Sequence, residues 1–232
     1  MTDLTGKRVL ILGAETDVGR AVATAVSEAG ASVAAVAATS DAEAAFAVQR
    51  LARRLSSGER KVIAQAIDAT NEAAVRVMVR QVSKELGGLD AVVFCEPPLQ
   101  RPDPVGPLAD QEVRDRMIRE MNESLNVAAH KRLTISGHLF KFAGRELDRY
   151  DGGPIVMASE GSAMALMSEE GEPLPKWWLE EVSYRDKPTE KVVREVLRAI
   201  KSRGLWWKTA KLTPRPLMPV YRFLARVLIR DR

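Results

Sequence analysis

Residues 7–19 read KRVLILGAETDVG and decide the fold of this 232-residue chain. A short apolar run ends at Gly13, and apolar residues then recur at helical spacing from Val18 until Gly30. This pattern predicts a strand, a tight turn and a helix. Glycine at Gly13 and Gly19 would let the backbone approach a pyrophosphate, and the N-terminus of the helix would offer free N–H donors. The stretch therefore predicts a phosphate loop.

The alternation of strands and helices continues after this first unit. Further strands are expected at residues 32–38, 61–67 and 89–95. A Ser-x-x-Glu capping box at Ser40 and Glu43 predicts a helix that runs to about Ser56, and Asn71 can cap another that ends before Gly87. Four strands that alternate with three helices predict a parallel, doubly wound sheet of the α/β class, with helices on both faces as in Rossmann-like folds.

The second half of the chain departs from this period. Five prolines fall between residues 96 and 107, where they predict a stiff loop. The elements expected beyond it are a helix at 110–150 that breaks near Gly137 or Gly144, a fifth strand at 154–158, a helix at about 189–201 and a final helix after a Trp-containing segment. The last part of the chain is thus expected to be irregular and mainly helical.

Composition and length favour one domain. A chain with 46% hydrophobic and 28% charged residues can close one large core. We divide the predicted domain, residues 1–232, into a nucleotide-binding half (1–95), a part with the long helix and fifth strand (96–165) and a divergent C-terminal segment (166–232). Neither a secretory signal nor an apolar run of transmembrane length is recognisable, so a cytoplasmic location is expected.

The chain has one cysteine and two histidines. A lone cysteine excludes an internal disulfide, and Cys95 with His130 and His138 offers no Cys/His pattern for a metal, so no metal site is expected. Cys95 ends an apolar strand, which favours a packing role over a nucleophilic one. Metal and disulfide chemistry are therefore not predicted for this chain.

The loop at residues 13–19 resembles that of the short-chain dehydrogenases/reductases, which reads Thr-Gly-x-x-x-Gly-x-Gly. The chain keeps the matching residues Gly13, Ala14, Val18 and Gly19. Leu12 stands in place of the first Thr, and Asp17 stands in place of the middle Gly. The resemblance implies an oxidoreductase that binds NAD(P), with Gly13, Val18 and Gly19 lining the cofactor, and it is strongest in the first half of the chain.

Asp17 bears directly on cofactor binding. A carboxylate about 6 Å from a phosphate, at an effective dielectric near 20, costs about 2–3 kcal/mol, which would weaken binding about a hundredfold. Asp17 could also be the N-cap of the helix and occupy the N–H groups that a pyrophosphate would use. Two interpretations stay open: a loop that still binds a dinucleotide, and a self-capped loop in a fold that no longer does.

Two further positions carry the resemblance to a cofactor site. Asp68 follows the third strand and resembles the family's Asp that contacts adenine, although an Asp there is also an ordinary helix-entry residue. After the second strand, Ala37-Ala38-Thr39-Ser40 stands where an acid would bind the ribose hydroxyls, which resembles the NADP-preferring β-ketoacyl reductase branch. Thr39 and Asp68 are thus expected at a site for NADP or NAD, with NADP favoured.

The family's catalytic Ser, Tyr and Lys must lie within hydrogen-bond reach, because the Tyr exchanges a proton with the substrate while the Lys lowers its pKa. Ser159 ends a strand as the family's Ser does, although a Ser in a strand-end turn is also common. Lys176 holds the place of the Lys, but Glu172 replaces the Tyr. Tyr184 precedes Lys187 by three residues instead of four. Ser159, Lys176 and Tyr184 are therefore the catalytic candidates.

Other features of the family are missing from the sequence. Phe-Cys-Glu-Pro at residues 94–97 replaces Asn-Asn-Ala-Gly, and the Asn of the long helix could be Asn122 or Asn126. The long helix after Lys176 and the strand ending in Pro-Gly, which wall the nicotinamide in the family, are not recognisable, whereas residues 191–200 resemble the late helix of bacterial members. Two hypotheses follow: an oxidoreductase that acts on a carbonyl or alcohol substrate through a degraded motif, or a non-catalytic structural or regulatory subunit.

The C-terminal segment is strongly basic, with nine basic residues and one acid between residues 201 and 232. Its apolar stripe and its arginines at i, i+4 spacing predict an amphipathic helix that packs on the core or on another subunit. We expect a homo- or hetero-oligomer through this helix or through the long helix at 110–150. Peripheral membrane contact by residues 214–232 is the second alternative, and nucleic-acid binding is not expected.

Overall fold

The computed structural model describes residues 2–56, 60–97, 111–159, 178–183 and 187–201. Its centre is a sheet of six parallel strands in the order β3-β2-β1-β4-β5-β6. The strands are β1 (Arg8–Leu12), β2 (Ser32–Ala37), β3 (Val62–Ala66), β4 (Ala91–Cys95), β5 (Pro154–Ser159) and β6 (Trp178–Ser183). The chain winds outward from β1 to β3 and then continues from β4 on the other side of β1. The predicted doubly wound α/β fold is therefore confirmed.

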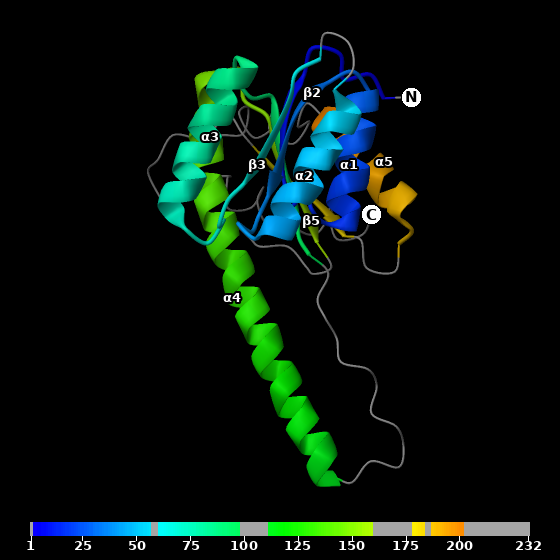
Figure 1. The fold of residues 1–232 in the computed structure, drawn as a ribbon, viewed down its shortest axis with the longest axis vertical. Coiled ribbons are helices and arrows are strands. Elements are labelled where there is room, and N and C mark those ends of the chain that lie inside the picture. The colour runs from blue at the N-terminus through cyan, green and yellow to red at the C-terminus, as the bar shows by residue number, and fades with distance from the viewer. Residues whose placement is uncertain (1, 57–59, 98–110, 160–177, 184–186, 202–232) are drawn as a thin grey trace, which may run out of the picture.

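Five helices in the described ranges cover the two faces of this sheet. They are α1 (Asp17–Glu28), α2 (Ala42–Leu55), α3 (Glu72–Leu86), α4 (Gln111–Arg149) and α5 (Thr189–Lys201). Figure 1 shows α1, α2 and α5 on one face and α3 and α4 on the other. Right-handed crossovers between parallel strands produce this arrangement, because the helices change face when the winding direction reverses at β4.

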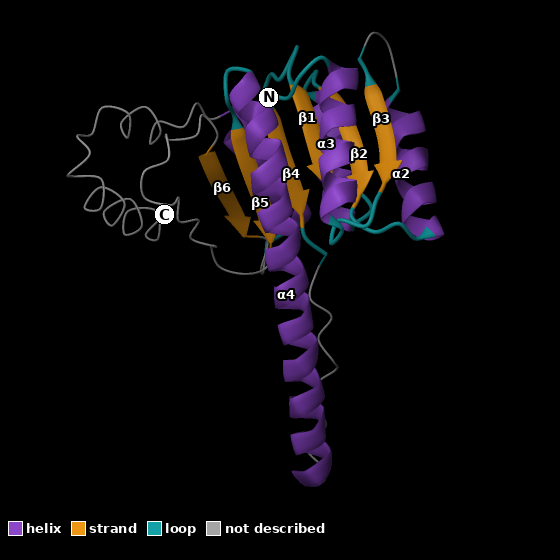
Figure 2. Cartoon of the chain, turned by 90° about the vertical axis from the view of Figure 1, so that its left-hand side faces the viewer, coloured by secondary structure: helices purple, strands orange, loops and turns teal. Residues whose placement is uncertain are grey.

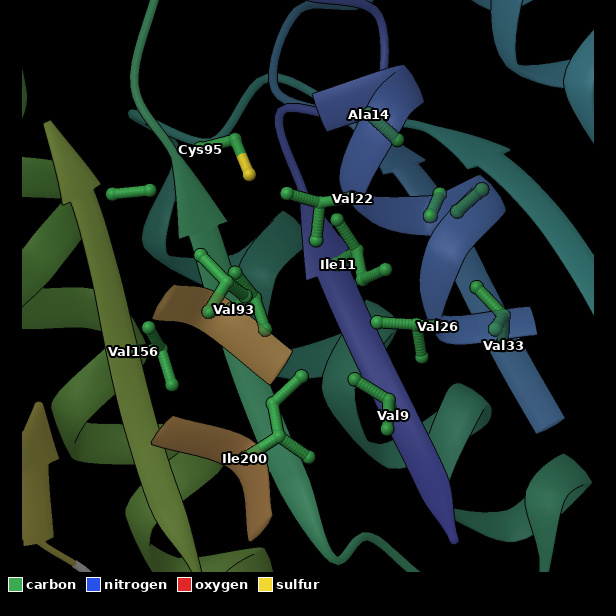
Figure 3. Packing of buried hydrophobic residues seen from close by; sticks show 14 of the residues in the cluster. Val9, Ile11, Ala14, Val22, Val26, Val33, Val93, Cys95, Val156 and Ile200 are labelled. Atoms are coloured by element: carbon green, nitrogen blue, oxygen red, sulfur yellow. The ribbon is translucent and has the colours of Figure 1, made fainter. Parts of the chain in front are cut away.

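Alternation along the strands divides the core into two clusters. On β1, Val9 and Ile11 pack with residues of α1 and α5, as Figure 3 shows for Ile200, whereas Leu10 and Leu12 pack with residues of α3 and α4. These four apolar side chains of β1 are fully buried, as expected for a parallel sheet covered on both faces. Burial of each such side chain contributes about 1.5–3 kcal/mol. The core therefore holds the carboxyl ends of the strands in a fixed register.

The N-caps of α1 and α2 differ from the sequence expectation. Thr16, not Asp17, caps α1, because the Thr16 Oγ1 atom accepts a hydrogen bond from the third amide of the helix at 2.9 Å. Asp41, not Ser40, caps α2 and likewise accepts from its third amide at 2.8 Å. The predicted Ser40 capping box is therefore wrong by one residue. The Asn71 cap of α3 is confirmed.

Helix α4 is continuous over 39 residues, so the predicted break near Gly137 or Gly144 is wrong. A glycine inside a helix costs only about 1 kcal/mol, and the residues around these two glycines pack on the sheet and α3. The buried positions begin at Ile135 and continue to Leu147. Figure 2 shows that the N-terminal part of α4 extends beyond the carboxyl edge of the sheet.

Strand β6 is the one described element that the sequence did not predict. It pairs in parallel with β5, from Trp178 beside Pro154 to Ser183 beside Ser159. Its sequence, WLEEVS, lacks the apolar run of a central strand, because β6 lies at the sheet edge and buries only Val182.

The C-terminal part of the chain is only partly described. Helix α5 is confirmed where the sequence predicted it. The Trp-containing segment and the predicted final helix, including residues 214–232, lie outside the described residues. Among the described helices, none combines the length and the apolar character needed to cross a membrane.

Candidate functional site

The loop between β1 and α1 lies at the carboxyl edge of the sheet, where the winding reverses between β1 and β4. Gly13 N and Ala14 N donate hydrogen bonds to Val36 O at 2.9 and 3.1 Å, which ties the loop to β2. Ligands bind to doubly wound sheets in the crevice at this point of reversal. The loop predicted from residues 13–19 therefore lies where a dinucleotide would bind.

Gly13 and Gly19 make the loop compact. Gly13 has a φ of +84°, a left-handed conformation that other residues rarely adopt, and a Cβ atom there would overlap the carbonyl oxygen of Cys95. A Cβ atom on Gly19 would overlap the carbonyl oxygen of Gly13. Only glycine fits at either position. The loop consequently presents the bare backbone that a pyrophosphate requires.

Thr16 organises the hydrogen bonds of the loop. Its Oγ1 atom donates to Gly13 O at 2.8 Å and accepts from Gly19 N at 2.9 Å. Within the described part of the chain, the amides of Asp17 and Val18 are left without an acceptor. These two N–H groups stand at the positive end of the α1 dipole, so they are the donors that can hold an anion.

The Asp17 carboxylate is paired with the Arg20 guanidinium one helical turn further on. The Asp17 side chain is 90% exposed, and Arg20 also donates to the carbonyl oxygen of Glu15 at 2.5 Å. Water and the positive partner both screen the negative charge. The repulsion between Asp17 and a phosphate is therefore smaller than the free-energy cost expected from the sequence, because that value assumed an unpaired carboxylate in a less polar environment.

An open cavity of about 800 Å³ is lined by residues of the loop, of α1 and of α2. Glu15, Arg20, Thr39 and Asp41 are among its lining residues. Thr39 Oγ1 donates to Asp41 Oδ2 at 2.9 Å, and hydrogen bonds from the Ala44 amide and from Thr39 lower the pKa of Asp41. The volume suits a small organic ligand. Thr39, predicted from the sequence, thus lies at a cavity beside the phosphate loop.

Asp68 lies in the turn after β3 and is exposed. Its Oδ1 atom accepts hydrogen bonds from Thr70 Oγ1 at 2.6 Å and from Thr70 N at 3.0 Å, and these bonds lower its pKa. The next amide, Ala69 N, donates to Ala38 O at 3.1 Å, which places the turn beside the end of β2. Asp68 therefore shapes the entry to α3, and its contact with adenine stays a prediction.

The carboxyl ends of β4 and β5 bring Glu96 and Ser159 together with Arg132 of α4. Glu96 N donates to the carbonyl that precedes Ser159 at 2.9 Å, and the Glu96 carboxylate lies 3.6 Å from Arg132 Nη1. Glu96 and Ser159 are 8% and 4% exposed. Ser159 thus ends β5 at the edge that carries the phosphate loop. The other two catalytic candidates, Lys176 and Tyr184, lie outside the described residues.

The helix residue beside these strand ends is Arg132. The expected candidates Asn122 and Asn126 are both exposed, and both precede Ile135, the first buried residue of α4. At a rise of about 1.5 Å per residue, they lie about 13 Å or more along the helix from it. The sequence signal that could have indicated Arg132 is Glu96, because a carboxylate at the end of a buried strand requires a cation.

Cys95 is fully buried at the end of β4, within the cluster drawn in Figure 3. Burial, with a smaller contribution from the Glu15 carboxylate, raises the pKa of the thiol to about 12. A thiol with this pKa is not a nucleophile at neutral pH, which agrees with the predicted packing role. Within the described ranges, no group of three or more His, Cys, Asp or Glu residues is placed to hold a metal ion.

Comparisons with known proteins place these features in a family. The family model for short chain dehydrogenases matches residues 7–129. The glycine betaine reductase ATRR of Emericella nidulans is 36% identical over 92 residues, which are 40% of this chain and 7% of that protein.

Two solved structures are also similar. Hydroxysteroid dehydrogenase from Escherichia coli aligns with a TM-score of 0.50 at 21% identity, over 68% of this chain and 57% of that one, which supports the fold. A short-chain type dehydrogenase/reductase from Mycobacterium marinum aligns with a TM-score of 0.48 at 29% identity, over the same shares. The chain therefore spans little more than half the length of these structures and a small part of the Emericella reductase.

The family model extends over more than half of the chain and includes β1, the Gly13–Gly19 loop and α1. The sheet order of the structure is the one typical of dinucleotide-binding folds. The chain belongs to the short-chain dehydrogenase family.

Proposed function

We propose that the chain binds a nicotinamide dinucleotide at the β1–α1 loop and is an oxidoreductase for a carbonyl or alcohol substrate. The observation that carries this proposal is the loop itself. Gly13 and Gly19 exclude side chains from it, and the amides of Asp17 and Val18 are open to an anion. These two amides would hold the pyrophosphate, and Arg20 would offset the charge of Asp17. The bound nicotinamide would supply hydride transfer.

Cofactor binding is tested by titrating the full chain with NADH and with NADPH, following cofactor fluorescence and thermal stability. At least one cofactor is expected to bind and to raise the melting temperature as its concentration increases. The matched variants are Gly19→Ala, whose Cβ would push against the Gly13 carbonyl, and Gly137→Ala, whose Cβ meets no atom within 4 Å. Binding is expected to weaken only in the first. No binding of either cofactor at millimolar concentration would refute the proposal.

Catalysis is proposed to use Ser159, because it lies at the edge of the sheet that carries the loop and can donate a hydrogen bond to a substrate oxygen. Lys176 and Tyr184 remain candidates for proton transfer on the basis of the sequence alone. Turnover of a panel of carbonyl substrates is expected to fall at least about tenfold in Ser159→Ala, with cofactor binding unchanged. Equal turnover in the wild type and in this variant would exclude Ser159.

The second candidate function is that of a non-catalytic structural or regulatory subunit. The observation that favours it is the ion pair between Arg132 of α4 and Glu96, which follows β4 in the stretch that replaces the family's Asn-Asn-Ala-Gly. A charged pair beside Ser159 leaves less room for a neutral carbonyl group. Cofactor binding without turnover on any substrate of the panel would support this second function over the first.

We also propose that the chain forms an oligomer through α4. The exposed apolar side chains Ile118, Val127 and Leu133 lie on the part of α4 that precedes its buried segment. Light scattering is expected to give a mass above that of one chain. Replacing Ile118 and Val127 together with Glu is expected to lower that mass, whereas the control Arg119→Glu leaves it unchanged. A single-chain mass for the wild type would contradict the proposal.

A further inference from the structure

Glu15 is the third residue of the phosphate loop, yet its side chain reaches the end of the neighbouring strand. Its Oε1 atom accepts a hydrogen bond from Ala38 N at 3.1 Å, and Ala38 directly follows β2. The two residues are 23 positions apart in the sequence. The loop thus supplies a carboxylate to a place where the sequence of β2 itself has none.

The second carboxylate oxygen of Glu15 lacks a partner. Oε2 is buried and, among the described residues, receives no hydrogen bond. Burial raises the pKa of Glu15, against the lowering effect of the Glu15 and Ala38 amides. A buried acceptor without a donor is unfavourable in a protein alone. A ligand with hydroxyl groups would provide the missing donor.

The end of β2 is the place where a doubly wound sheet meets the ribose of a dinucleotide. There, a carboxylate binds the ribose hydroxyls of NAD, whereas a cation accommodates the 2′-phosphate of NADP. In this chain the three residues after β2 are Ala38, Thr39 and Ser40, so no acid directly follows the strand, and the first one is Asp41, the N-cap of α2. Glu15 lines the cavity at this place together with Thr39 and Asp41.

We propose that the loop carboxylate of Glu15 replaces the missing acid of β2 and makes the site selective for NAD(H) over NADP(H), an inference that rests on the proposed dinucleotide binding. The ribose hydroxyls would donate to the Glu15 carboxylate once its Oε2 atom, which is buried and without a partner in the free protein, turns toward the cavity that Glu15 lines. A 2′-phosphate would instead lie close to the negative charges of Glu15 and Asp41. The sequence favoured NADP because no acid directly follows β2. Glu15, a residue of the loop, supplies a carboxylate at that place instead.

Four arginines also line this cavity. Arg20 is held by the Asp17 carboxylate and by the Glu15 carbonyl oxygen. The other arginines that line the cavity, Arg50, Arg53 and Arg54, belong to the second half of α2. Because α2 begins beside β2, a rise of about 1.5 Å per residue places the Cα atom of Arg50, the first of these arginines, about 12 Å along the helix from Ala42.

The test measures the affinities of the full chain for NADH and NADPH by isothermal titration calorimetry. The wild type is expected to bind NADH at least about tenfold more tightly than NADPH. The Glu15 carboxylate would accept a hydrogen bond from the ribose of NADH, whereas it would repel the 2′-phosphate of NADPH. Adenosine 5′-monophosphate and adenosine 2′,5′-bisphosphate should show the same order, which removes the nicotinamide from the comparison. Glu15→Gln is expected to reduce the NADH preference about tenfold.

The control is Glu28→Gln, which removes an exposed carboxylate at the far end of α1 and should leave both affinities unchanged. Circular dichroism checks that each variant is folded. Equal or tighter NADPH binding by the wild type, or an unchanged preference in Glu15→Gln, would overturn the role of Glu15 while dinucleotide binding stands. Failure of both cofactors to bind would overturn the proposed function and this inference with it.

Discussion

The Asp17–Arg20 ion pair sets the charge at the phosphate loop. Without Arg20, the Asp17 carboxylate would act on a bound pyrophosphate with only water to screen it. Arg20→Ala is therefore expected to weaken dinucleotide binding about three- to tenfold, most strongly at low ionic strength. Asp17→Asn in the same chain should restore the affinity. Titrations of the two single variants and the double variant give the coupling between these residues.

The control for this cycle is Arg76→Ala, which removes an exposed arginine on α3, at the other face of the sheet. Its affinity should equal that of the wild type. If Arg20→Ala and Asp17→Asn change the affinity independently, without rescue in the double variant, the ion pair has no role in binding.

Asp90 connects the starts of β1 and β4. It accepts hydrogen bonds from Arg8 Nε at 2.7 Å and Arg8 N at 3.0 Å. Burial raises the pKa of Asp90, but the bonds and charge of Arg8, with Lys7, outweigh burial and leave the pKa below 3.8. The ionised carboxylate therefore stabilises the fold above this pH, and the contribution is lost as the pH falls through the lowered pKa.

Asp90→Asn tests this contribution by chemical denaturation. The variant is expected to lower the free energy of unfolding at pH 7 by about 1–3 kcal/mol, and the difference from the wild type should shrink as the pH falls below about 4. The exposed Glu28→Gln serves as the control and should show almost no change at pH 7. A difference that stays constant down to pH 2 would contradict the assignment.

Cys95 offers a direct measure of core protection, because it is the single cysteine of the chain. Burial raises its pKa to about 12, so almost none of the thiol is ionised at pH 8. Reaction with a thiol reagent at pH 8 is expected to be at least about a hundredfold slower in the native protein than in guanidinium chloride. Equal rates would show that the β4 end is open to solvent.

Helix α4 continues through Gly137, although the sequence predicted a break near this glycine. Gly137 is exposed, and a Cβ atom on it would meet nothing within 4 Å. Gly137→Ala is therefore expected to stabilise the protein by about 0.5–1 kcal/mol in thermal or chemical denaturation. In Gly153→Ala, by contrast, the new Cβ would overlap the Asp90 carbonyl oxygen, and stability should fall. A destabilised Gly137→Ala would indicate that the helix is kinked at that residue.

The elements that the sequence predicted correctly are those with strong local patterns. The first four strands consist mainly of apolar residues, and Asn71 caps α3 by its own side chain. Strand β6 was missed because an edge strand needs few apolar residues, and its WLEEVS sequence carries two glutamates. The cap of α2 was missed because Ser40 and Asp41 are both good cap residues, and only the backbone geometry selects one.

For the molecule as a whole, the sequence predicted the sheet and the phosphate loop but not the contacts between distant segments. Glu15 meets Ala38, and Glu96 meets Arg132, only after the strands are aligned in the sheet. No local pattern encodes either contact. Gly13 and Gly19, in contrast, could be assigned from the sequence because backbone geometry alone requires glycine there.

The central claim is that the amides at the start of α1 bind the pyrophosphate of a nicotinamide dinucleotide. Nuclear magnetic resonance of the ¹⁵N-labelled full chain during titration with NADH tests it most directly. The amide signals of Asp17 and Val18 are expected to shift in a saturable manner, while that of Gly87, at the end of α3, stays in place. Unchanged Asp17 and Val18 signals at saturating NADH would contradict the account.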